Sequence, residues 1–156
     1  MLKSKIRSVD LFDKSFNESK IGDSVTITLE DDIDISRGDM IVGANNIPNI
    51  GQDLEMIICW FNEKPLQVKS KYVIRQVTTE ARCIIKAVDS KLNVNTLEED
   101  QEDKNIRMND VARISVKTTQ PVFYDDYKVN NSTGSVVLIN EATNETVAAG
   151  MIQAKG

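Results

Sequence analysis

Residues 134–152 read GSVVLINEATNETVAAGMI, and this stretch decides the fold. It holds two apolar runs, GSVVLIN at Gly134–Asn140 and ETVAAGMI at Glu145–Ile152, joined by the short polar sequence EATN. Two β-prone runs separated by so few residues predict a hairpin, because antiparallel strands can be joined by a short turn whereas parallel strands need a long crossover. We therefore expect an antiparallel sheet in the C-terminal part of the chain.

Further apolar runs of strand length precede this hairpin at short intervals. They are LEMIICWF (Leu54–Phe61), YVIRQV (Tyr72–Val77), EARCIIKAV (Glu80–Val88) and DVARISVKTT (Asp110–Thr119). Only Thr78 and Thr79 separate the second run from the third, which predicts another hairpin. Pro121 is expected to end the last of these runs or to mark a sheet edge, because proline cannot donate to a ladder. Together with the final hairpin, the region supplies about six or seven strands, enough to close a small barrel.

The N-terminal region supplies fewer strands. SVTITL (Ser24–Leu29) alternates apolar and polar residues, which predicts a half-exposed antiparallel strand. SKIRSVDLF (Ser4–Phe12) predicts another strand, and Arg37-Gly38-Asp39 predicts a turn before the short run MIV.

A segment rich in glycine and asparagine separates the two regions. It reads GANNIPNIGQ at residues 43–52, and such a composition predicts a domain boundary. We therefore expect a partial β-barrel at residues 1–46 and a complete one at residues 53–156, in an all-β chain. A partial barrel leaves unpaired strand edges, so the first segment is expected either to pack on the complete barrel or to pair with another copy.

Composition excludes several classes of protein. Of the 156 residues 40% are hydrophobic but only 5% are aromatic, so the core must consist mainly of Val, Ile and Leu. The net charge of −5 disfavours nucleic acid as a partner, because phosphate backbones are bound by basic surfaces. No apolar run has the length of a membrane span or of a signal peptide, so we expect a cytoplasmic protein without a membrane partner.

Catalytic and metal sites are not predicted. The chain has no histidine, and Cys59 and Cys83 lie inside apolar runs, where they are expected to be two buried, reduced thiols. The acidic runs at residues 31–34 and 98–103 lack the spacing of a calcium loop. Thr96 and Glu99 have the spacing of a helix capping box, which would allow a short helical turn, but we expect residues 95–108 to form a long surface connection. We assign no catalytic, cofactor-binding or metal-binding residue.

Two stretches carry a resemblance to a known family. The first is LEDDIDISRGDMIV at Leu29–Val42, and the second is YDDYKVNNSTGSVVLINEATNETVAAGMI at Tyr124–Ile152. Together they resemble the two β-barrel domains that follow the GTP-binding domain in the large, GTPase subunit of bacterial sulfate adenylyltransferase. The second stretch has DDY where that family has DRY, so the resemblance does not extend to an ion pair made by that arginine. The glycines and asparagines of this stretch are interpreted as turn and close-packing residues.

The resemblance implies antiparallel barrels of the elongation-factor domain 2/3 type, the first of them partial. It also implies a role, within the full subunit, in coupling GTP hydrolysis to the ATP-dependent adenylation of sulfate through contacts with the catalytic adenylylating subunit. GTP and Mg²⁺ are expected only in the GTP-binding domain, because this chain has no GxxxxGK[ST] loop. The chain alone is expected to be inactive, with its partner contacts near Arg37, Tyr124 and Tyr127.

Two other functions are compatible with parts of the sequence. A barrel module of a translation elongation factor would bind transfer RNA, and this alternative requires a basic face that the composition does not favour. An independent enzyme would need a pair of acidic residues, for which Asp125 and Asp126 are the obvious choice. Because neighbouring residues of a strand point to opposite faces, these two carboxylates are not expected to share a site.

Overall fold

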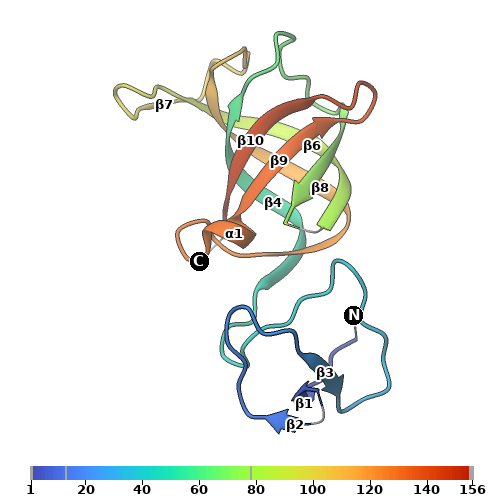
Figure 1. The fold of residues 1–156 in the computed structure, drawn as a ribbon. Coiled ribbons are helices and arrows are strands. Elements are labelled where there is room, and N and C mark those ends of the chain that lie inside the picture. The colour runs from blue at the N-terminus through green and yellow to red at the C-terminus, as the bar shows by residue number, and fades with distance from the viewer. Residues whose placement is uncertain (1, 13, 78, 155–156) are drawn as a thin grey trace. The chain divides into compact units, whose positions relative to one another are not determined.

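The computed structural model describes residues 2–12, 14–77 and 79–154. The chain forms two compact units, which divide between Asp39 and Met40, and each is described by itself (Figure 1). The boundary predicted at residues 43–52 overlaps the start of a strand, because the first strand of the second unit begins at Asn49.

The second unit is a closed antiparallel barrel, which confirms the predicted fold class. Its elements are β4 (Asn49–Trp60), β5 (Lys71–Gln76), β6 (Thr79–Leu92), β7 (Glu99–Asp100), β8 (Val111–Tyr124), α1 (Asn131–Gly134), β9 (Ser135–Asn140) and β10 (Thr146–Gln153). The strands follow the order β5-β9-β10-β4-β8-β6-β7, and an additional pairing of β5 with β6 closes the ring. Six strands therefore form the barrel, and β7 pairs with the end of β6 without belonging to the ring.

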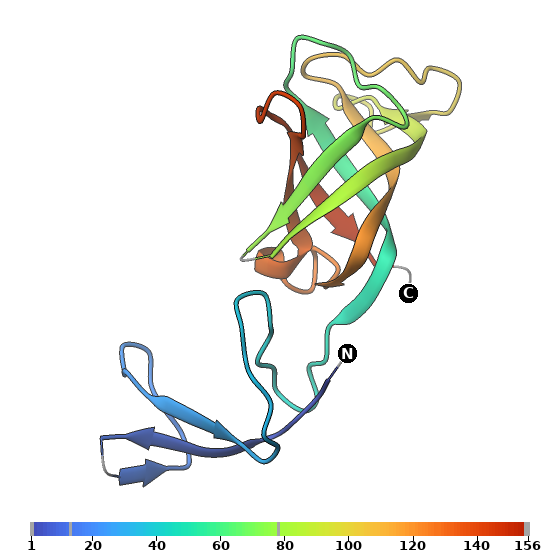
Figure 2. The same ribbon diagram turned by 90° about the vertical axis from the view of Figure 1, so that its right-hand side faces the viewer.

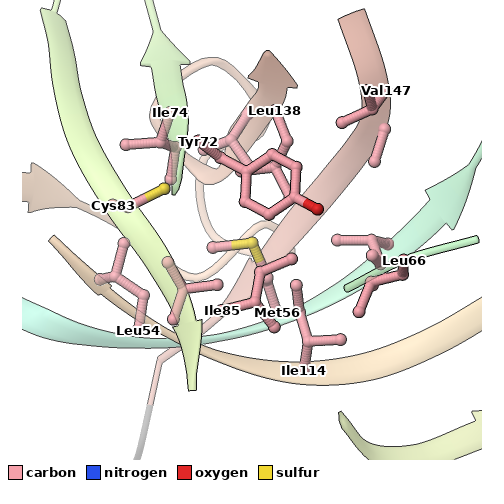
Figure 3. Packing of buried hydrophobic residues seen from close by; sticks show 14 of the residues in the cluster. Leu54, Met56, Leu66, Tyr72, Ile74, Cys83, Ile85, Ile114, Leu138 and Val147 are labelled. Carbon is pink, nitrogen blue, oxygen red and sulfur yellow. The ribbon is translucent and has the colours of Figure 1, made fainter. Parts of the chain in front are cut away.

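Alternating side chains fill the barrel interior. Along β4 the inward positions Leu54, Met56, Ile58 and Trp60 are buried, and β8 and β10 contribute buried residues with the same period. In Figure 3 the labelled side chains from these strands and from β5, β6 and β9 converge on one cluster. Trp60 packs edge-to-face on Tyr72 with ring centroids 6.1 Å apart. The interior is therefore a packed core and not a channel.

The strand that contains Pro121 continues beyond this residue, so Pro121 does not end it. Beyond Thr118 the strand β8 pairs with β4 but no longer with β6, so Pro121 lies at a sheet edge, the second of the two predicted roles. Between the pairs Asp53–Lys117 and Gly51–Val122, β4 contributes one residue whereas β8 contributes residues 118–121. Pro121 lies in this bulge, where the missing N–H is not needed for a regular ladder. The hydroxyl of Thr118 donates to the carbonyl oxygen of Gln120 at 2.7 Å and so satisfies a backbone group within the bulge.

Both predicted hairpins of this unit are present. In the β9–β10 turn, Asn144 has φ 59° and its N–H donates to the carbonyl of Asn140 at 2.8 Å. Asparagine tolerates this left-handed conformation better than most residues, which explains its place in the turn. In the other hairpin Gln76 pairs with Thr79, so the connection has the predicted length but is displaced by one residue toward the N-terminus, and Thr78 lies outside the described residues.

The connection between β6 and β8 is long and mostly exposed, as expected from the sequence, and the short helical turn that the spacing of Thr96 and Glu99 would allow is not formed. The side chain of Asn93 accepts the N–H of Asn95 at 2.9 Å, and the carbonyl of Asn93 accepts the N–H of Leu97 at 2.8 Å. These bonds form a turn and return the chain to pair with β6 through β7. Figure 1 shows this loop extending away from the barrel. A turn closed by an asparagine side chain competes directly with the first turn of a helix.

The first unit is a small antiparallel sheet. Its strands are β1 (Ile6–Leu11), β2 (Lys14–Phe16) and β3 (Thr26–Leu29), arranged in the order β2-β1-β3, and they appear in blue in Figure 2. The alternation predicted for residues 24–29 is confirmed, since Ile27 and Leu29 are half-buried and Thr26 and Thr28 are exposed. Within residues 2–12 and 14–39, no side chain is fully buried. This sheet therefore has no core of its own.

Candidate protein-interaction surface

The two tyrosines expected at a contact lie where β8 leaves the barrel. Tyr124 is the last residue of β8 and packs against the buried cluster. Tyr127 is half-buried, and its backbone N–H donates to the carbonyl of Ile152 at 3.0 Å. Both residues are thus held by the barrel itself, which gives them a structural role.

The segment that follows Tyr127 closes this end of the barrel. Asn130 caps α1 by accepting the N–H of Ser132 at 3.1 Å, and the side chain of Gln76 donates to the carbonyl of Thr133. A Cβ atom added at Gly134 would lie 2.4 Å from the Cα of Tyr127. Only glycine fits there, which confirms the interpretation of Gly134 as a close-packing residue.

Asp125 and Asp126 make separate sets of hydrogen bonds. The carboxylate of Asp125 accepts from the hydroxyl of Thr133, whereas that of Asp126 accepts the N–H groups of Lys128 at 2.8 Å and Ala154 at 3.1 Å. Both residues follow the end of β8 and each carboxylate stabilises backbone or turn structure. The arrangement provides no shared acid–base pair.

Arg37 belongs to the first unit and is exposed. Its neighbour Asp39 accepts the N–H of Ser36 at 2.8 Å, which stabilises the predicted turn. Within the described part of the first unit, Arg37 forms no ion pair with Asp34 or Asp39.

The outer surface of the barrel carries apolar side chains on three adjacent strands. Cys59 on β4 lies directly between Ala149 on β10 and Val111 on β8. In the next row Ile57 on β4 lies beside Met151 on β10. We call the surface formed by six residues the outer apolar patch: Ile57, Cys59, Phe61, Val111, Ala149 and Met151.

Exposure supports this description of the patch. Cys59 and Ala149 are exposed, Met151 is 37% exposed and Phe61 is 40% exposed. The N–H of Phe61 donates to the carbonyl of Val147, so Phe61 continues the outward phase of β4 beyond the last strand residue. Antiparallel strands with one wet face usually place polar side chains outward. An apolar patch at such positions is typical of a surface that binds another protein.

Ion pairs border the patch. Arg113, which lies beside Ile57 in the same row, pairs with Glu99 at 2.8 Å. In the row of Cys59 and Ala149, Arg75 on β5 lies beyond Val137 on β9 and pairs with Glu80 at 2.6 Å. An apolar centre with charged groups at its margin has the anatomy of a protein interface.

Cys59 is not buried, contrary to the prediction from the sequence, whereas Cys83 is buried as predicted. The prediction failed because it inferred burial of Cys59 from its place inside the apolar run MIICW. In fact Met56, Ile58 and Trp60 point inward, and Ile57 and Cys59 point outward. The signal of a second apolar face was the unbroken run itself, since a strand with one wet face should alternate.

The acidic residues of the β6–β8 connection are engaged with nearby donors. A hydrogen bond from Arg113, followed by one from Ser90, lowers the pKa of Glu99. The backbone N–H of Asn105 and then the ammonium of Lys91 lower the pKa of Asp103. Among the described residues, no group of three or more acidic or cysteine side chains is placed to hold a metal ion. No helix in the described ranges is long and apolar enough to cross a bilayer.

Comparison with known proteins places the barrel in a family. Residues 53–153 match the family model described as GTP-eEF1A C-terminal domain-like. The chain belongs to this family. The matched range contains nearly all of the GTP-eEF1A C-terminal domain-like barrel and the whole outer apolar patch.

Curated relatives of this chain confirm the resemblance seen in the sequence. Sulfate adenylyltransferase subunit 1 of Alteromonas mediterranea is 39% identical over 150 residues, which are 96% of this chain and 32% of the relative. The protein of the same name from Bacteroides thetaiotaomicron is 36% identical over 96% of this chain and 32% of its own. The bifunctional enzyme CysN/CysC of Mycobacterium tuberculosis is 42% identical over 83% of this chain and 21% of its own. The chain spans about a third or less of the length of these relatives.

A solved structure gives the same fold. The crystal structure of sup35 in complex with GDP superposes with a TM-score of 0.77 and 17% identity, over 97% of this chain and 37% of sup35. At this level of identity the likeness concerns the fold alone. It agrees with the elongation-factor type of barrel predicted from the sequence.

Proposed function

We propose that this chain acts as a noncatalytic binding and coupling region of sulfate adenylyltransferase subunit 1. In the full subunit it would couple GTP hydrolysis to ATP-dependent sulfate adenylation through contacts with the catalytic adenylylating subunit, in the cytoplasm. The observation that carries the proposal is the similarity to proteins of that name over 96% of this chain. GTP and Mg²⁺ would bind outside this chain, which has no GxxxxGK[ST] loop.

The outer apolar patch is the surface that we assign to the catalytic subunit. The side chains of Tyr124 and Asp125, by contrast, pack on the core or bond to the segment that closes the barrel. The patch lies on regular strands of a closed barrel, so its shape is fixed before binding. A preformed surface loses little conformational entropy when a partner docks.

Coupling requires that docking depends on the state of the bound nucleotide. A module without catalytic groups can influence a distant reaction only through a difference in partner affinity between two states. The barrel would therefore provide the docking surface, and the nucleotide state of the GTP-binding domain would change the affinity of the docked partner. A coupling energy of about 1–3 kcal/mol, typical of allosteric proteins, would suffice for a marked effect.

Calorimetric titration of this chain with the separately expressed catalytic subunit, at low and high salt, tests the proposal. We expect saturable binding with little dependence on salt, because the proposed contact is apolar. The double substitution Phe61→Ser and Met151→Glu should weaken binding by at least about tenfold, or about 1.4 kcal/mol. Val68→Ser, at another exposed apolar residue of the same unit, serves as the matched control.

The proposal fails if the chain does not bind, or if the control substitution weakens binding as much as the double variant does. Binding of transfer RNA that falls steeply with salt would instead favour the elongation-factor alternative. The net charge of −5 argues against that alternative.

A further inference from the structure

Basic side chains gather on the outer surface of three adjacent strands of the barrel, β5, β6 and β8, of which β5 and β6 are green in Figure 2. They occupy exposed positions that alternate with buried ones along each strand: Lys71, Arg75, Arg82, Lys86 and Lys117. We call the surface formed by these five residues the basic face. Because the ring of strands is closed, the basic face contains no open strand edge.

The cations of the basic face are only partly compensated. Three of them pair with carboxylates at 2.6 to 3.1 Å: Arg75 with Glu80, Arg82 with Glu141, and Lys86 with Asp53. Lys71 and Lys117 form no ion pair among the described residues. The face therefore keeps two uncompensated positive charges, on a chain whose net charge is −5.

These two lysines lie on either side of an apolar side chain. Ile84 on β6 pairs with Lys71 on β5 and with Lys117 on β8, and it is 38% exposed. Neighbouring strands are about 4.8 Å apart, so the Cα atoms of the two lysines are separated by about 10 Å. An apolar centre between two cations is complementary to a protein segment that carries carboxylates on both sides of an apolar side chain.

We propose that the basic face binds an extended acidic segment of a partner protein, in which an apolar residue lies two positions from an acidic residue on each side. Alternate residues of an extended segment point to the same side, so these three side chains meet the face together. The apolar side chain covers Ile84, and the two carboxylates pair with Lys71 and Lys117.

Nucleic acid is a poorer occupant of the basic face. Three carboxylates lie among its cations or at its margin and repel a phosphate backbone: Asp53, Glu80 and Glu141. The described outward residues of the face include no aromatic side chain on which a base could stack. The exposed apolar centre at Ile84 likewise fits a protein segment better than a nucleotide chain.

The basic face and the outer apolar patch can be occupied at the same time. In the closed ring, β6 at the centre of the basic face lies opposite β10 of the patch. The two surfaces share only β8, on which Val111 and Lys117 are about 20 Å apart at about 3.3 Å per residue. The barrel can thus link two partners, and the inference holds whether or not the patch binds the catalytic subunit.

Fluorescence anisotropy of the full chain with a labelled peptide tests the inference. The probe repeats the sequence Glu-Ser-Leu-Ser, which places glutamate and leucine alternately on one side of an extended chain. A peptide with lysine in place of glutamate is the control probe. We expect saturable binding of the glutamate peptide alone, with affinity that falls as salt rises. The double substitution Lys71→Gln and Lys117→Gln should weaken binding by about tenfold or more.

The matched control is the double substitution Lys64→Gln and Lys128→Gln, which removes two exposed charges elsewhere on the same unit. Ile84→Ser provides a second test at the apolar centre, and an unchanged circular dichroism spectrum checks that each variant is folded. Equal binding of the two peptides, or an equal loss of affinity in the two double variants, would overturn the inference. Tighter binding of single-stranded RNA of the same net charge would also overturn it and would assign the basic face to nucleic acid.

Discussion

At Gly134 the backbone of Tyr127 approaches so closely that a single methyl group decides whether the barrel end can close. An added Cβ would lie 2.4 Å from one backbone atom of Tyr127 and 2.7 Å from another. We expect Gly134→Ala to destabilise the barrel by about 2–4 kcal/mol, because backbone atoms must move to relieve the overlap. Thermal denaturation followed by circular dichroism measures the effect.

Substitutions at two other glycines serve as comparisons for this prediction. At Gly150 an added Cβ would meet side-chain atoms of Ile58 and Val136 at 3.0 and 3.1 Å, so Gly150→Ala should cost less, about 1 kcal/mol. At Gly43 the nearest atom is 3.9 Å away, and Gly43→Ala should be nearly neutral. A loss of stability for Gly43→Ala equal to that for Gly134→Ala would contradict the role assigned to close packing.

The two cysteines show what a residue's neighbours in sequence do and do not reveal. Both lie in apolar runs, yet Cys59 is exposed and Cys83 is buried. Burial raises the pKa of the Cys83 thiol to about 12. Local sequence predicted the strands correctly but not which face of β4 was covered, because the outward residues of that strand are as apolar as the inward ones.

At the scale of elements, ion pairs hold the β6–β8 connection to the barrel. The ammonium of Lys91 lies 2.9 Å from Asp110 and 3.3 Å from Asp103, and the guanidinium of Arg113 lies 2.8 Å from Glu99. The bond to Asp110 is the main cause of the raised pKa of Lys91, and the bond from Arg113 is the main cause of the lowered pKa of Glu99.

These pKa shifts predict how the connection responds to pH. A lowered carboxyl pKa stabilises the folded state above the unfolded pKa, and this contribution is lost as the pH falls below about 4. A raised lysine pKa stabilises below the unfolded pKa, and its contribution is lost as the pH rises above about 10.5. We expect the amide resonances of residues 98–104 to shift at both extremes, before the barrel unfolds. Glu99→Gln should remove the part of the acid transition that depends on the bond from Arg113, while the lowered pKa values of Asp100 and Asp103 keep the rest. An unchanged titration would contradict this account.

Strands were easier to predict than the features that interrupt them. Apolar runs indicated all six strands of the barrel, because their period and length follow from local sequence. The continuation of β8 past Pro121 depends on a bulge opposite Gln52, which is set by the partner strand. Similarly, the turn closed by the Asn93 side chain forms in place of a helical turn capped by Thr96. Both motifs are local, and residue spacing alone does not show which of them forms.

At the scale of the whole molecule, the two units differ in how they bury apolar side chains. The barrel has a continuous core, whereas the described part of the first unit has no fully buried side chain. We expect amides of β4, β8 and β10 to exchange with solvent at least about a hundredfold more slowly than those of β1 and β3, because protection follows local stability. Hydrogen exchange read by mass spectrometry measures both units in one sample. Equal protection would contradict the view that only the barrel has a core of its own.

The candidate surface could not have been found from motifs, because it consists of ordinary apolar residues brought together by the barrel. Cys59 lies 90 residues from Ala149 in sequence, and only the pairing of β4 with β10 makes them neighbours. The sequence resemblance identified the relatives and the barrel type, but directed attention to Tyr124 and Tyr127, which the structure shows to be packed. Tertiary pairing therefore changes which residues form the proposed contact.

The rate at which iodoacetamide alkylates Cys59, with and without the catalytic adenylylating subunit, tests the central claim most directly. Cys59 lies within the outer apolar patch, and Cys83 is buried with a raised pKa and so serves as an unreactive internal reference. If the catalytic subunit docks on the patch, saturating amounts should slow alkylation of Cys59 by at least about tenfold, because binding excludes the reagent. An unchanged rate at concentrations where calorimetry shows full binding would place the interface elsewhere and contradict the account.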